Sequence, residues 1–229
     1  MQAYIASVEL ARRYYPERDS IVVNFSGNNF SNELIYGKEH MAFKEECLVF
    51  LKDVKKQISE FSLYADSIIF SGGEPCLQRM ALLDLARYSK KEGLRTILET
   101  NCSKSGAINS LLRDNLIDVM ILRLDAPFQE AIFQKVTRSG NFFKPTRDIM
   151  AEIELSLDII SKNKEKLFIE SRTRLLSDIE YTENDINSIA KQVEKLSCSW
   201  RVTGDCIDAS LSSKVRNACQ NFLINVEIC

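Results

Sequence analysis

The chain has 229 residues, of which 45% are hydrophobic and 27% charged, and its formal net charge is -2. This composition is typical of a globular protein with a sizeable core, and the charge gives no reason to expect nucleic acid or a membrane surface as a partner. No apolar run approaches the roughly 20 residues of a membrane span. Residues 1–16 lack the pattern of a signal peptide, so we expect a cytoplasmic protein.

Strand-like and helix-like segments alternate through the first half of the chain. Short apolar runs predict the strands, and apolar residues that recur with a 3.6-residue period predict the helices. Gly72-Gly73 ends the second predicted strand, and Gly93 ends the second predicted helix. The predicted order is strand 21–25, helix 43–61, strand 67–70, helix 77–91, strand 94–98, a short helix through Leu112, and strand 119–122.

The second half continues the alternation. Ile149, Ile153, Leu157 and Ile160 mark a helix, and a fifth strand begins at 167–169. Thr182, with Asp185 three residues later, predicts the capped start of an amphipathic helix. A sixth strand at 200–202 is followed by a last helix and an edge strand, and we expect the apolar run 222–224 to be ordinary core. Strands alternating with helices imply parallel pairing, which suits an open partial barrel or a doubly wound sheet.

Seven cysteines are scattered along the chain without a C-x-x-C pair, which argues against a disulfide framework or a structural zinc site. We expect most of them to be small buried apolar side chains. His40 is the only histidine and we expect it to be solvated or to cap a helix, so a histidine-based metal site is nearly excluded. The cysteines are Cys47, Cys76, Cys102, Cys198, Cys206, Cys219 and Cys229.

Polar motifs follow four successive strands. A Gly-Gly after a strand is ordinarily a tight turn, and a Thr-Asn is ordinarily a helix cap, so each motif alone is unspecific. Four in order, each at the end of a strand whose loop contributes to the site in such folds, are specific. They are Phe25-Ser26-Gly27, Ser71-Gly72-Gly73-Glu74-Pro75, Glu99-Thr100-Asn101 and Arg123-Leu124-Asp125-Ala126-Pro127.

With these motifs in register, the chain resembles the radical S-adenosylmethionine (SAM) superfamily, and within it the short activating enzymes of anaerobic ribonucleotide reductase and pyruvate formate-lyase. The resemblance covers residues 4–193. It implies an α/β fold, a partial (β/α)6 barrel of parallel strands in one domain over 1–229. It also implies a first loop in which three cysteines hold a [4Fe–4S] cluster that cleaves SAM to a radical.

The first loop of this chain, residues 24–37, departs from that pattern. The register places Asn28, Asn32 and Ile35 at the three cysteine positions. Iron–sulfur clusters require thiolates, and neither an amide nor an alkyl side chain replaces one. Cys76 and Cys102 sit near strand ends and can approach each other, but two thiols are too few. We therefore expect no cluster, no other metal, and loss of radical chemistry.

The remaining motifs predict a site for SAM or a related nucleotide. The resemblance implies that Gly72, Gly73 and Glu74 meet the methionine amino group, and that Thr100 and Asn101 lie near the ribose and carboxylate. The fourth-strand motif has its charges exchanged relative to the family's Asp-Leu-Lys-Ala-Pro, with Arg123 and Asp125 in place of Asp and Lys. Arg123 is then expected to replace a bound cation and to pair with Glu99 or Asp125, unless both residues reflect drift. Asn28 and Asn32 complete the candidate ligand-binding set.

At the end of the fifth strand, Arg172 is placed to reach a carboxylate or phosphate. An ion pair with Glu170 is the structural alternative.

Several functions are compatible with these residues. One is a cluster-free protein that binds SAM or a related nucleotide without radical chemistry. Another is a pseudoenzyme that serves as a scaffold or regulatory subunit for an active paralogue or a former substrate protein. A third is an active enzyme whose loop cysteines were replaced, although Asn and Ile are unusual replacements. A fourth is an unrelated α/β domain. Whether any reaction is catalysed stays open.

Overall fold

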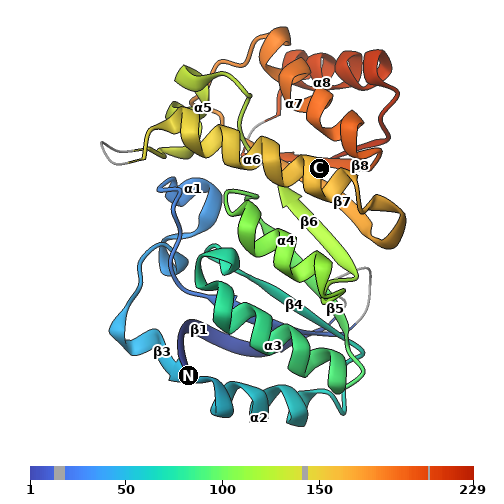
Figure 1. The fold of residues 1–229 in the computed structure, drawn as a ribbon. Helices are drawn as coiled ribbons and strands as arrows, with labels where there is room; N and C mark the ends of the chain where they lie inside the picture. The colour runs from blue at the N-terminus through green and yellow to red at the C-terminus, as the bar shows by residue number, and fades with distance from the viewer. Residues whose placement is uncertain (13–18, 141–143, 206) are drawn as a thin grey trace.

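The computed structural model describes residues 1–12, 19–140, 144–205 and 207–229. Its strands are β1 Gln2–Ala11, β2 Ser20–Phe25, β3 Leu48–Phe50, β4 Ser67–Gly72, β5 Arg95–Thr100, β6 Val119–Arg123, β7 Phe168–Leu175, β8 Ser199–Gly204 and β9 Val226–Ile228. They form one nine-stranded sheet in the order β3-β1-β2-β4-β5-β6-β7-β8-β9 (Figure 1). β1 pairs antiparallel with β2 and β3, whereas each pair from β2 to β9 is parallel.

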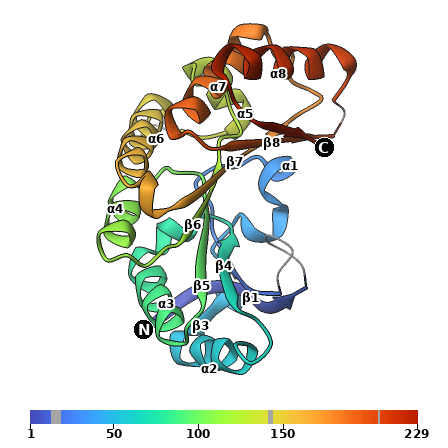
Figure 2. The ribbon, with the colours of Figure 1, turned by 90° about the vertical axis from the view of Figure 1, so that its right-hand side faces the viewer.

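Helices connect the parallel strands, as crossover connections require. They are α1 Glu33–Tyr36, α2 Leu51–Phe61, α3 Arg79–Lys91, α4 Ser105–Arg113, α5 Glu130–Thr137, α6 Thr146–Ser161, α7 Glu183–Leu196 and α8 Ala209–Phe222. Short 3-10 turns cover Lys38–His40, Glu45–Cys47, Pro75–Gln78 and Lys164–Lys166. The sheet curves, with α3, α4 and α6 on its convex side and α1 on the other side (Figure 2). The predicted α/β class is confirmed, and the curved, mostly parallel sheet is consistent with a partial barrel. None of the helices in the described ranges is long and apolar enough to cross a bilayer.

Two apolar clusters lie on opposite faces of the sheet. The larger one fills the space between sheet and outer helices, and includes Leu82 and Leu85 of α3. The smaller one consists of Val22, Ile69, Ile97, Val119 and Ile121. The first four of these are aligned across β2, β4, β5 and β6, so they form an apolar floor on the concave face.

The helix predicted over 43–61 begins too early. Residues 48–50 instead form β3, which pairs with β1, and α2 starts at Leu51. The N-terminal strand β1 was not predicted, so nothing in the local pattern indicated an edge for residues 48–50 to join. Tertiary pairing therefore overrides the helical period. The expectation of ordinary core also fails for Leu223, which ends α8 in the left-handed conformation with 93% of its surface exposed.

Candidate ligand site at the carboxyl ends of the strands

The four polar motifs lie at one edge of the sheet. β2, β4, β5 and β6 are consecutive neighbours and run parallel, so their carboxyl ends meet there. This assembly was predicted from the order of elements, and the strand order confirms it.

The turn after β4 packs directly against the loop after β2. Gly72 has a φ of 94°, and a Cβ on Gly73 would lie 2.2 Å from the Gly27 carbonyl oxygen. The backbone N–H of Gly73 donates to the Phe25 carbonyl, and that of Glu74 donates to the Gly27 carbonyl, both at 2.8 Å. The glycines therefore do allow close backbone approach. In this structure the glycines contact the backbone of the first loop, whereas the resemblance implied that they contact a ligand.

The carboxylate of Glu74 connects the turns after β4 and β5. It is 1% exposed and accepts hydrogen bonds from Cys76 N at 3.0 Å, Thr100 Oγ1 at 2.8 Å and Asn101 N at 2.7 Å. Burial raises the pKa of Glu74, and these donors offset part of that rise. Glu74 thus has a structural role, and its predicted contact with an ammonium group stays a prediction.

Two buried thiols flank this carboxylate. Thr100 Oγ1 lies 3.7 Å from the Cys76 sulfur and accepts a hydrogen bond from the Cys102 backbone N–H at 3.1 Å. Burial, with a further contribution from the Glu74 charge, raises the pKa of both thiols well above the ordinary value. Both side chains are therefore neutral thiols, which are poor nucleophiles. Across the described ranges, no three His, Cys, Asp or Glu side chains gather in a way that would hold a metal ion.

Neutral side chains join the first loop to the turn after β5. Asn101 Nδ2 donates to Asn29 Oδ1 at 3.1 Å and lies 3.4 Å from Asn28 Oδ1. Asn29 Nδ2 donates to Ser103 Oγ at 2.9 Å. The Asn28 amide nitrogen is buried and has no hydrogen-bond partner among the described residues. Of these, Asn28 and Asn101 were predicted site residues, whereas Asn29 and Ser103 were missed.

The other two positions that the resemblance assigned to cysteines stabilise α1. Asn32 caps this helix by accepting from Leu34 N, and its Nδ2 donates to the Val136 carbonyl at 2.6 Å. Ile35 is 6% exposed and packs into the main core. Both residues therefore stabilise the loop by ordinary polar and apolar contacts.

Arg123 is the centre of a charged cluster beneath that loop. Its Nη1 lies 3.2 Å from Glu99 Oε1, and its Nη2 lies 3.2 Å from Asp125 Oδ2. Nη2 also donates to the Ile35 carbonyl at 3.2 Å, and the guanidinium lies 5.3 Å from the centroid of the Tyr36 ring. The predicted pairing of Arg123 with Glu99 or Asp125 is confirmed for both partners. Arg123 thus occupies the position of an internal cation between two carboxylates and a carbonyl.

The surroundings shift the pKa values of these groups in different directions. Burial raises the pKa of Glu99, but Arg123 and Arg172 outweigh it, so the net shift is downward. Burial raises the pKa of Asp125 despite the neighbouring guanidinium, and it raises that of Tyr36 well above the ordinary value. The Tyr36 hydroxyl and the Asp125 carboxylate are both buried and interact with each other, which adds to the rise for Tyr36 and offsets part of the rise for Asp125.

A cavity of about 340 Å³ opens beside this cluster. Four arginines and one acid contribute to its wall, which spans the ends of β5 to β8. Its lining residues are Ile35, Glu99, Arg123, Arg172, Thr173, Arg174, Arg201 and Thr203. The ion pair predicted between Arg172 and Glu170 is confirmed, with 2.6 Å between Nε and Oε1. Arg201 was predicted to lie in a strand but not in the site, because its alignment with Arg172 depends on the pairing of β8 with β7.

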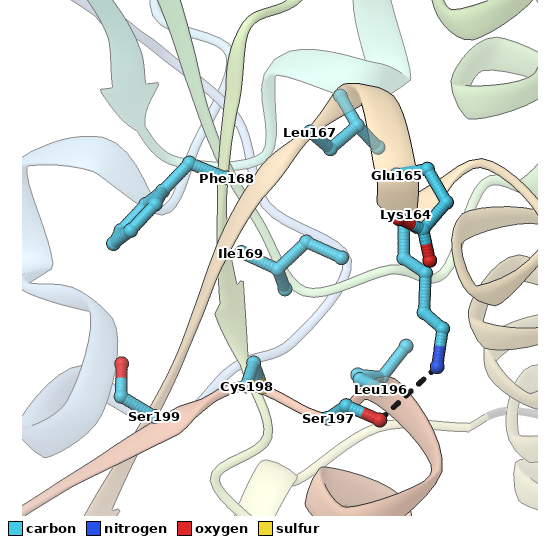
Figure 3. A pocket seen from close by; sticks show the side chains of 9 residues that line it. All are labelled: Lys164, Glu165, Leu167, Phe168, Ile169, Leu196, Ser197, Cys198 and Ser199. Carbon is cyan, nitrogen blue, oxygen red and sulfur yellow. Dashed lines mark hydrogen bonds between the residues drawn. The ribbon is translucent and has the colours of Figure 1, made fainter.

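A second cavity, of about 400 Å³, lies at the start of β7 and β8 (Figure 3). In this cavity Lys164 Nζ donates to Ser197 Oγ at 3.1 Å. Burial raises the pKa of Cys198, one of its lining residues, to about 12. This cavity is at the opposite end of the strands from the predicted motifs and holds no activated nucleophile.

Comparison with known proteins supports the radical SAM resemblance, but it also suggests a [4Fe–4S] cluster, which was not expected from the sequence. Residues 20–141, just over half of the chain, match the family model described as "4Fe-4S single cluster domain". The cysteines within that range are Cys47, Cys76 and Cys102. A protein of Methanocaldococcus jannaschii, whose name is that of a glycyl-radical enzyme activating enzyme, is 29% identical over 196 residues, covering 85% of this chain and 77% of that protein.

Solved structures share the fold at low identity. SuiB of Streptococcus suis has a TM-score of 0.59 and 11% identity, covering 89% of this chain and 47% of SuiB. TYW1 with a lysine-pyruvate adduct bound has a TM-score of 0.59 and 16% identity, covering 89% and 72%. Native anSMEcpe with bound AdoMet and the Cp18Cys peptide has a TM-score of 0.59 and 15% identity, covering 88% and 60%. The present chain therefore spans less than half of SuiB.

Proposed function

Since this chain belongs to the 4Fe-4S single cluster domain family, within the radical SAM superfamily, we propose that it is a cluster-free member that binds SAM or a related nucleotide without radical chemistry. The proposed site comprises the predicted residues Gly72, Gly73, Glu74, Thr100, Asn101, Arg123, Asp125, Asn28 and Asn32. The ligand is proposed because known relatives bind it. The absence of a cluster is proposed because of the side chains in the first loop of this chain.

The observation that carries the proposal is the set of side chains at the three cysteine positions of the resemblance. Asn28 is beside Asn101, Asn32 caps α1 and binds the Val136 carbonyl, and Ile35 is buried. Nitrogen of a neutral amide and an alkyl group do not replace anionic sulfur on iron. The donors present here therefore do not fit a [4Fe–4S] cluster.

The three cysteines inside the matched range do not offer a substitute. Cys76 and Cys102 are buried neutral thiols, and Cys47 does not combine with them into a metal-binding group. In addition, Arg123 donates to the Ile35 carbonyl, so its positive charge lies directly under the loop. We propose that these contacts stabilise the loop in the absence of a metal.

Ligand binding is supported by the cavity beside Arg123 and by the fold. The cavity of about 340 Å³ is within the range of about 300–1,000 Å³ that is usual for small-molecule sites. In related folds the ligand binds at the carboxyl ends of the strands, which is where this cavity opens. Native anSMEcpe, which shares the fold, binds AdoMet.

Isothermal titration with SAM and with S-adenosylhomocysteine tests this proposal. We expect saturable one-to-one binding of at least one of them by protein prepared without iron. Glu99→Gln, at the cavity wall, is expected to change the affinity, whereas Arg147→Gln on the outer surface of α6 is the matched control and should not. Absence of binding of both compounds at millimolar concentration would sink the proposed ligand role.

A role as the non-catalytic partner of an active enzyme is the second candidate. It is favoured by apolar side chains that remain exposed around the first loop and the β3 edge: Leu34 at 52%, Phe43 at 50%, Leu48 at 39% and Phe50 at 51%. The relative from Methanocaldococcus jannaschii is named for acting on another enzyme. Affinity purification from the native host, with Leu34→Glu/Phe43→Glu as the control, should recover a stoichiometric partner with the unaltered chain only. Equal recovery by both forms would argue against this candidate.

A further inference from the structure

We infer that the arginine-lined cavity at the ends of β5 to β8 binds a doubly charged oxyanion, either a phosphate or a dicarboxylate. This inference rests on the proposed use of the strand ends as a ligand site, and it specifies the charge of the ligand. The arrangement of the arginines, their ion pairs, and one buried donor without a partner all support it.

The arginines form an ordered array across neighbouring strands. Arg123 of β6, Arg172 of β7 and Arg201 of β8 are aligned in the sheet register. Parallel strands lie about 4.8 Å apart, so the bases of these side chains are spaced at that interval. Arg174 lies two residues beyond Arg172 and therefore faces the same side of the sheet. The array places four guanidinium groups around one small volume.

Each arginine of this array has an acidic partner, but most of these partners lie outside the cavity wall. Glu99 is the one acid among the residues that line the cavity, and it lies at the end nearest Arg123. Arg201 pairs with Glu227, whose side chain is 60% exposed, at 2.9 Å, and its other terminal nitrogen lies 3.8 Å from the buried Glu170 carboxylate. Arg174 pairs with Asp205, whose side chain is 34% exposed. Ion pairs in contact with water contribute little and exchange readily. The end of the cavity near Arg174 and Arg201 is therefore the end that suits an anion.

Arg174 also carries a donor that the fold leaves without an acceptor. Its Nε is buried and makes no hydrogen bond within the described ranges of the chain. A buried donor without a partner costs free energy that a bound oxygen would recover. Thr203, aligned with Arg174 on β8, adds a hydroxyl to the same wall.

The charge of the cavity favours some ligands over others. Guanidinium groups bind phosphate and carboxylate in a planar, two-pronged geometry that ammonium groups do not match. A ligand that carries two negative charges therefore fits this cavity.

Titration calorimetry at low ionic strength with pyrophosphate in one arm and succinate in the other tests the inference. We expect saturable one-to-one binding of at least one anion, and the arm that binds more tightly identifies phosphate or carboxylate as the preferred source. Arg174→Gln and Arg201→Gln should each weaken binding by about tenfold, as expected for loss of one charge-assisted contact. Arg201→Lys, which keeps the charge, should lose less and serves if a Gln variant does not fold.

Arg147→Gln removes the same charge from the exposed surface of α6 and is the matched control. If neither anion binds at millimolar concentration, the inference is wrong. It is also wrong if Arg147→Gln weakens binding as much as Arg201→Gln, because the effect would then follow net charge alone. Binding of an anion but not of SAM would support this inference and refute the proposed SAM ligand, and the reverse result would do the opposite.

Discussion

Replacing Arg123 by methionine tests whether this side chain acts as the internal cation of the site. The substitution keeps an unbranched stem of similar shape and removes the charge between Glu99 and Asp125. It also removes the hydrogen bond to the Ile35 carbonyl and the contact with the Tyr36 ring.

The expected loss follows from leaving buried carboxylates without their partner. Removing one member of a buried ion pair costs about 3–5 kcal/mol. The Arg123 side chain keeps 19% exposure, while those of Glu99 and Asp125 are 10% and 0% exposed, so we expect a loss near the lower limit, about 3 kcal/mol at neutral pH.

The pH dependence of the loss distinguishes this mechanism from simple loss of packing. In the unaltered chain the lowered pKa of Glu99 stabilises the fold at neutral pH, and this contribution is lost as the pH falls through that pKa. Without Arg123 we expect the pKa of Glu99 to rise above its unfolded value, and the pKa of Asp125, which burial already raises, to rise further. Their ionisation then opposes folding, so stability is lost as the pH rises through these raised values. The difference between variant and unaltered chain should therefore shrink between pH 7 and pH 5.

Urea unfolding followed by circular dichroism at pH 5 and pH 7 measures both quantities. Arg147→Met, on the exposed surface of α6, is the control and should leave stability unchanged at either pH. The reasoning is refuted if Arg123→Met destabilises the fold by less than about 1 kcal/mol at pH 7, or by the same amount at both pH values.

Three further predictions concern Asn32 of the first loop, the buried carboxylate of Glu74, and the two buried thiols. Asn32→Ala should lower the free energy of unfolding in urea by about 1–3 kcal/mol, because the α1 cap and the partner of the Val136 carbonyl are both lost; an unchanged midpoint would contradict the role assigned to Asn32. Glu74→Gln should destabilise the fold by about 2–3 kcal/mol. In the unaltered chain both carboxylate oxygens accept hydrogen bonds from N–H and O–H groups, and the Gln amide nitrogen would place a donor against some of these donors. Glu92→Gln is the exposed control. Cys76→Ser/Cys102→Ser should leave the number of thiols that react with a disulfide reagent in the folded chain unchanged, since both thiols are buried; a lower number would show that they are accessible.

Local pattern was enough to predict the parallel strands and the edge at which they meet. The apolar runs of β2, β4, β5 and β6 are each bounded by a glycine or a polar motif, so their order and direction follow from the chain alone. The capping box of Thr182 and Asp185 was predicted in the same way and is confirmed. Likewise, the exchanged charges of the fourth strand indicated that Arg123 would have an acidic partner.

Other features depend on contacts that no local pattern contains. Glu74 was predicted to face a ligand, but two of its hydrogen-bond donors, Thr100 and Asn101, come from the next strand along the sheet. The alignment of Arg172 with Arg201 depends on the register of β7 and β8, which helix α7 separates in the chain. Similarly, β3 exists only because β1 offers it a neighbour.

The conformation of the first loop is the clearest case. The resemblance places Asn28, Asn32 and Ile35 at the positions of a cysteine motif, but the sequence does not indicate what these residues do. The structure gives each a place in the fold, in an amide network, in a helix cap and in the core. These roles are the physical basis for proposing a loop that is stable without metal.

Anaerobic reconstitution with ferrous iron and sulfide, followed by iron analysis and an absorbance spectrum, tests the central claim most directly. The purified chain should stay colourless and retain no stoichiometric iron after desalting. The reason is that the three positions in the first loop carry two neutral amides and an alkyl group, none of which replaces a thiolate on iron. A brown protein that retains four irons per chain, with the charge-transfer absorbance of an iron–sulfur cluster, would contradict the account.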